Sequence, residues 1–136
     1  MEQFRKYAGG EDVAALEAAV REDPHDGGRV YRLGREYLRL GRWDMCIKTL
    51  IRHLSTPGAV WADERSDSMC CIARAYKAKG DFANAKKWYL RAAAEAGHLR
   101  EPFAELSQLL YELHEYEGAA YFEKCALMID ERKKNA

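Results

Sequence analysis

Residues 33–43 read Leu-Gly-Arg-Glu-Tyr-Leu-Arg-Leu-Gly-Arg-Trp, and the spacing of this stretch recurs twice more along the chain. In each copy a large residue and a small one stand side by side, and a second large residue comes three positions after the small one. A turn position follows, and an aromatic residue stands two positions after the turn. The second copy begins at Ile72 and the third at Leu106. The turn positions Gly41, Gly80 and His114 are separated by 39 and then 34 residues. This recurrence predicts helix-turn-helix pairs that stack along the chain.

A period near 34 residues with these side chains resembles the tetratricopeptide repeat (TPR), over residues 25–129. The fold class expected from it is all-α, a right-handed superhelix of about three helix pairs plus a leading helix. The repeat domain is expected over residues 11–130, with a leading helix over 11–23 and repeats over about 27–56, 60–97 and 100–130. Residues 1–10 are expected to be a frayed N-terminal arm and residues 131–136 a disordered tail.

Composition excludes several classes of protein. The 136 residues are 48% hydrophobic and 32% charged with zero net charge, which is typical of one globular domain and argues against general nucleic-acid binding. No apolar run approaches the roughly 18–20 residues that cross a bilayer, and the first residues lack the apolar core of a signal peptide. We therefore expect no membrane span and a cytoplasmic location.

The residues of common catalytic and metal sites do not form recognisable motifs. The four cysteines lack paired Cys-x-x-Cys spacing, the four histidines lack His-Glu-x-x-His spacing, and no phosphate loop or Gly-x-Ser-x-Gly occurs. The cysteines are interpreted as structural. We expect no catalytic residue, no metal and no cofactor, and thus no enzyme in this chain alone. An unrecognised site across the repeats remains the alternative.

The groove of a repeat stack is lined by the first helix of each pair, and it is where a protein or peptide partner is expected. By phase, its residues are Tyr31, Arg35, Arg39, Asp67, Arg74, Lys77, Glu101, Gln108 and Tyr111. The four cations would form a basic strip that suits an acidic segment, with the tyrosines as aromatic anchors. The alternative is a solvated helix face whose arginines pair with neighbouring acids.

A narrower resemblance rests on three stretches: Tyr31-x-x-Gly34-x-x-Tyr37, Pro57-Gly58-x-x-Trp61-x-x-Glu64-Arg65 and Arg100-Glu101-Pro102-Phe103. Together they resemble the repeat tail behind the catalytic domain of bacterial family-2 glycosyltransferases. The five extra residues between Pro57 and about Ser66 belong to this pattern and suggest a longer first helix in the second repeat. The metal-binding Asp-x-Asp motif of those enzymes does not occur here.

The function expected from these patterns is a non-catalytic interaction or assembly module of a glycosyltransferase system. A free-standing TPR scaffold or adaptor unrelated to sugar transfer is the alternative. No polar capping helix is evident after residue 130, so a homo-oligomer through the uncapped C-terminal helix is also expected.

Overall fold

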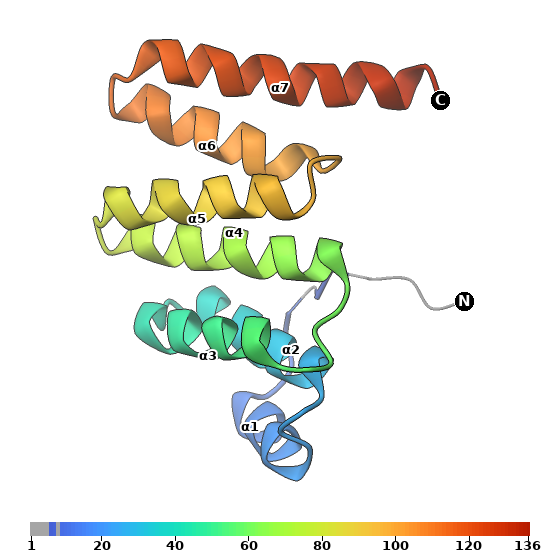
Figure 1. The fold of residues 1–136 in the computed structure, drawn as a ribbon. Coiled ribbons are helices and arrows are strands. Elements are labelled where there is room, and N and C mark those ends of the chain that lie inside the picture. The colour runs from blue at the N-terminus through green and yellow to red at the C-terminus, as the bar shows by residue number, and fades with distance from the viewer. Residues whose placement is uncertain (1–5, 8) are drawn as a thin grey trace.

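The computed structural model describes residues 6–7 and 9–136, which form seven α-helices and no strand. The helices are α1 (Val13–Glu22), α2 (Gly27–Arg39), α3 (Trp43–Ser55), α4 (Ala62–Ala78), α5 (Phe82–Glu95), α6 (Arg100–Glu112) and α7 (Tyr116–Lys134). They stack in chain order, with α1 and α7 at opposite ends (Figure 1). Helices α2/α3, α4/α5 and α6/α7 are the three pairs and α1 is the leading helix. The predicted all-α superhelix is confirmed.

The same turn joins the two helices of every pair. Gly41, Gly80 and His114 have φ angles of 74°, 81° and 62°, in the left-handed region that glycine adopts without penalty. In all three turns the amide of the next residue donates to a carbonyl five positions earlier, at 2.8–2.9 Å. His114 therefore takes the glycine conformation at the third turn, which confirms the repeat phase read from the sequence.

The extra residues of the second repeat lengthen its first helix. Helix α4 has 17 residues, whereas α2 and α6 have 13 each. The longer helix begins directly after the Thr56–Trp61 connection and adds about one turn. The predicted longer first helix of the second repeat is therefore observed.

Two clusters of buried side chains hold the stack together. The first joins α1 to α4 through residues such as Val30, Leu50 and Ile72. The second joins α4 to α7 through residues such as Tyr89 and Leu106. Both clusters include the half-buried Leu54, Tyr76 and Trp88, so the apolar core is continuous along the repeats.

The two ends of the chain differ from the predictions. In the described part of the N-terminal arm, Tyr7 and Gly10 both hydrogen-bond to the buried Glu36 of α2, so this part is not frayed. The rest of the predicted arm, residues 1–5 and 8, lies outside the described residues. The prediction of a disordered tail over residues 131–136 differs from the structure at residues 131–134, because α7 continues to Lys134. Three basic residues in its last turn favour the helix by compensating the helix dipole.

Candidate partner-binding groove

The nine predicted groove residues all lie on the first helices of the three pairs. Helix α2 carries Tyr31, Arg35 and Arg39, helix α4 carries Asp67, Arg74 and Lys77, and helix α6 carries Glu101, Gln108 and Tyr111. The structure brings many of them together as links between neighbouring repeats. Their hydrogen bonds decide which of them a partner could still contact.

The first link joins α2 to α4 through Asp67. Tyr31 donates its hydroxyl to Asp67 Oδ2 at 2.6 Å, and Arg35 Nη1 donates to the same oxygen at 2.9 Å. Burial, followed by the neighbouring charge of Asp67, raises the pKa of Tyr31. Because Tyr31 is only 2% exposed, it ties two repeats together and does not offer an aromatic anchor to a partner.

The second link repeats this arrangement between α4 and α6. Arg74 donates from Nε and Nη2 to the two carboxylate oxygens of Glu105, at 2.7 and 2.6 Å. Tyr89 of α5 donates to Glu105 Oε1 at 3.1 Å. Burial alone would lower the pKa of Arg74, but the hydrogen bonds to Glu105 together with the neighbouring charges outweigh it and the pKa rises. Glu105 and Tyr89 were missed as site residues, because Glu105 lies one helical turn after Glu101, the residue that the 34-residue step matches to Asp67.

The other two cations of the predicted basic strip also pair with acids. Arg39 forms an ion pair with Glu36 one turn earlier on α2. Lys77 Nζ lies 3.2 Å from the Glu112 carboxylate of α6. All four cations therefore pair with carboxylates, as the alternative interpretation expects. The structure does not present them as an open cationic surface.

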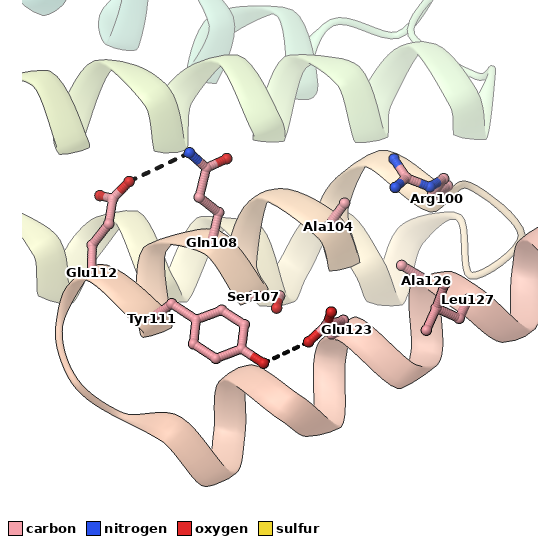
Figure 2. Close-up of a pocket in the computed structure, with 9 residues that line it drawn as sticks. All are labelled: Arg100, Ala104, Ser107, Gln108, Tyr111, Glu112, Glu123, Ala126 and Leu127. Atoms are coloured by element: carbon pink, nitrogen blue, oxygen red, sulfur yellow. Dashed lines mark hydrogen bonds between the residues drawn. The ribbon is translucent and has the colours of Figure 1, made fainter.

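The C-terminal part of the groove is hollowed between α6 and α7 (Figure 2). The hollow has a volume of about 430 Å³, and its lining residues are Arg100, Ala104, Ser107, Gln108, Tyr111, Glu112, Glu123, Ala126 and Leu127. The Tyr111 hydroxyl donates to Glu123 Oε2 at 2.5 Å, which raises the pKa of Tyr111. Gln108 and Tyr111 thus lie together in this part of the groove, with two carboxylates beside them.

A smaller hollow of about 190 Å³ lies between α4 and α6 and reaches the N-terminal arm. Its lining residues are Lys6, Asp63, Ser66, Asp67, Cys70, Leu99, Glu101 and Pro102. Three carboxylates and one lysine are in this set. The lysine comes from the arm, and its Nζ lies 3.6 Å from Asp67 Oδ1. Glu101 is the predicted groove residue that remains exposed here.

A buried polar cluster without a sequence signature lies between α3 and α4. Ser68 Oγ lies 2.7 Å from His53 Nδ1, and Glu64 Oε1 lies 2.8 Å from His53 Nε2. These residue types match those of a hydrolase triad, but both His53 and Ser68 are 0% exposed, so a substrate cannot reach the hydroxyl. The cluster instead satisfies polar groups between α3 and α4. Residues 11 to 15 positions apart on different helices give no local motif that could have revealed it.

The cysteines lead to a prediction about thiol reactivity. Burial raises the pKa of Cys46, Cys70 and Cys71, in the last case to about 12, whereas Cys125 is half-buried. Because the thiolate is the reactive form, we expect a disulfide reagent at about pH 8 to modify only Cys125 in the folded chain. Absorbance of the released thiol reports the number of groups modified. Cys125→Ser should abolish the rapid phase, and rapid reaction of a second thiol would contradict the burial.

The described residues contain neither a candidate metal cluster nor a helix that could span a membrane. No group of three His, Cys, Asp or Glu side chains within residues 6–7 and 9–136 could hold a metal ion. No helix in this part of the chain is long and apolar enough to cross a membrane.

The chain is similar in fold to several solved structures. Neither a protein-family model nor a curated protein sequence matches the chain. A crystal structure of MamA superposes with a TM-score of 0.80 at 16% identity, over 91% of this chain and 70% of that one. MamA residues 41 to the end from Desulfovibrio magneticus RS-1 give 0.76 at 14% identity, over 91% and 67%. PilF from Pseudomonas aeruginosa gives 0.74 at 16% identity, over 85% of this chain and half of that protein.

These similarities agree with the helical-repeat fold. None of these three structures is a glycosyltransferase by its description, and the resemblance to the repeat tail of such enzymes stays a prediction. The chain is thus similar in fold to MamA and PilF, as a TPR-type superhelix with a groove along its first helices.

Proposed function

We propose that this chain is a non-catalytic protein-interaction module whose groove binds an extended segment carrying basic and aromatic side chains. The observation that carries the proposal is the N-terminal arm, which already lies against the groove helices. Lys6 pairs with Asp67 of α4, and Tyr7 donates to Glu36 Oε2 of α2 at 3.1 Å. The amide of Gly10 donates to the same oxygen at 3.1 Å. A partner segment of similar chemistry would compete with the arm.

The charges of the groove favour this kind of partner over an acidic one. Residues 101–131 contain eight acids and one lysine, and two of these acids, Glu101 and Glu123, lie on α6 or in its hollow with α7 without an ion pair to Arg74 or Lys77. The four cations expected to attract an acidic segment already pair with carboxylates. A segment that supplies its own lysine or arginine would meet unlike charges along the groove.

The test uses a variant of the 136-residue chain in which the arm is released by substitution. In Lys6→Ala/Tyr7→Ala, the contacts to Asp67 and Glu36 are lost, so a labelled peptide with the sequence of residues 1–12 should bind about tenfold more tightly than to the original chain. Fluorescence anisotropy gives both affinities. The matched control is Lys48→Ala, an exposed lysine of α3.

A second peptide with glutamate in place of Lys6 separates charge recognition from general stickiness. It should bind weakly to every variant, since it would place a carboxylate beside Asp67. Failure of the released variant to bind the native peptide would contradict the proposal. So would equal binding of the two peptides.

The wider setting of the module is a separate part of the proposal. The Arg100-Glu101-Pro102-Phe103 step and the lengthened α4 favour an assembly role within a bacterial glycosyltransferase system, with a free-standing adaptor as the alternative. Sequencing the coding region on both sides of this segment distinguishes them. A continuous upstream frame with a strand-rich Asp-x-Asp domain supports the first, and in-frame stop codons on both sides support the second.

A further inference from the structure

The outer face of α7 exposes three large apolar side chains. Ala119, Ala126 and Ile129 bury the inner side of this helix. On the opposite side, Tyr121, Leu127 and Met128 are 63%, 55% and 48% exposed. Exposed apolar side chains that adjoin on one face commonly mark a contact surface.

The charges on this face are arranged symmetrically around Leu127 and Met128. Residues 124–131 read Lys-Cys-Ala-Leu-Met-Ile-Asp-Glu, so a lysine stands three positions before Leu127 and a glutamate three positions after Met128. When the stretch is set against an antiparallel copy of itself, Lys124 faces Glu131 on both sides of the centre. When it is set against a parallel copy, Lys124 faces Lys124 and repels it.

We propose that two copies of this chain associate through α7 in an antiparallel pair centred between Leu127 and Met128. Lys124 of each copy then faces Glu131 of the other, and Leu127 of each copy contacts Met128 of the other. The interface is isologous and closes as a two-fold dimer. It lies at the end of the stack and shares Leu127 with the lining of the hollow between α6 and α7. The contacts of the N-terminal arm with Glu36 and Asp67, which carry the proposed function, lie on α2 and α4 and outside this interface.

The spacing and shape of the face fit this register. Lys124 and Glu131 are seven residues apart, which is two turns or about 10.5 Å along the helix, and therefore lie on one side of it. A surface hollow of about 500 Å³ lies on the same side and is lined by Lys124, Leu127, Met128, Glu131, Arg132 and Asn135. An apolar side chain of the other copy can fill it. Since each copy contributes one helix, the interface is small and its dissociation constant is expected on the order of 10 μM.

Charge reversal tests the register. In Lys124→Glu each glutamate faces the other copy's Glu131, and in Glu131→Lys two lysines face each other, so either variant alone should dimerise about tenfold more weakly. An equimolar mixture of the two variants restores an attractive pair on both sides. Sedimentation velocity from micromolar to submillimolar concentration should therefore show a heterodimer of nearly original affinity in the mixture.

Two further variants test the apolar contact. Leu127→Glu should abolish the dimer, whereas Leu90→Glu, which changes a leucine of α5 that is 48% exposed, should leave it unchanged. The four substituted side chains are all exposed: Leu90, Lys124, Leu127 and Glu131. Circular dichroism checks that each variant is folded. A monomeric original chain at all these concentrations would overturn the proposal, as expected if a different segment covers α7. A dimer that survives both charge reversals, or a mixture no tighter than its components, would overturn it too.

Discussion

Replacing Gly34 by valine is expected to lower the free energy of unfolding by about 3 kcal/mol, because the first repeat has no room for a side chain there. A Cβ atom at Gly34 would lie 2.1 Å from Leu50 Cδ2 and 2.5 Å from Leu50 Cγ. Leu50 is fully buried between α2 and its neighbours, so it can move only by displacing other core atoms. Urea denaturation followed by circular dichroism measures the change.

A double-mutant cycle shows whether this clash is the cause. Leu50→Ala removes the obstructing atoms and leaves a cavity, so Gly34→Val should cost much less in that background than in the original chain. Ala83→Val on the exposed side of α5 controls for the helix propensity of valine. Equal costs of Gly34→Val in both backgrounds would show that Leu50 is not what excludes the side chain.

The fold could be predicted because its determinants are local and repeated. The turn at Gly41 recurs at Gly80 and His114 with the same backbone geometry. The third turn could therefore be recognised from the repeat spacing, although histidine stands there in place of glycine. The five-residue insertion also has a local effect, because it lengthens α4 without shifting the repeats around it. Helix pairs that contact mainly their sequence neighbours make such inference reliable.

The candidate site could be predicted only in part, since its character depends on contacts between repeats. Periodicity places Arg35 and Arg74 on groove helices, and the structure agrees. Whether they are free depends on Asp67 and Glu105, which lie more than 30 positions away and reach them only through the stacking geometry. The packing of Tyr7 against Glu36 has no periodic signal at all, because an extended segment outside the repeats can adopt many courses.

The ion pair between Arg74 and Glu105 leads to the second prediction with a large effect. Its outcome decides whether the basic strip binds an acidic partner or pairs with neighbouring acids of the chain. If Arg74 is a ligand-binding residue, Arg74→Glu leaves the protein stable and abolishes binding of an acidic partner. The structure instead predicts that Arg74→Glu lowers the free energy of unfolding by about 3 kcal/mol, because it sets two carboxylates side by side in a half-buried position. Loss of the bidentate pair also leaves the charge of Glu105 with only Tyr89 as a hydrogen-bond donor among the contacts described.

Exchange of the two residues separates charge from shape in this prediction. Arg74→Glu/Glu105→Arg restores opposite charges and should recover part of the lost stability, although the hydrogen bond from Tyr89 to a carboxylate at position 105 is lost. Lys77→Glu is the matched control, since its pair with Glu112 is more exposed and should contribute less than about 1 kcal/mol. An Arg74→Glu variant as stable as the original chain would mean that Arg74 is not needed to join α4 to α6. The basic strip would then be available to an acidic partner after all, because a link that contributes no stability can exchange Glu105 for a carboxylate from outside.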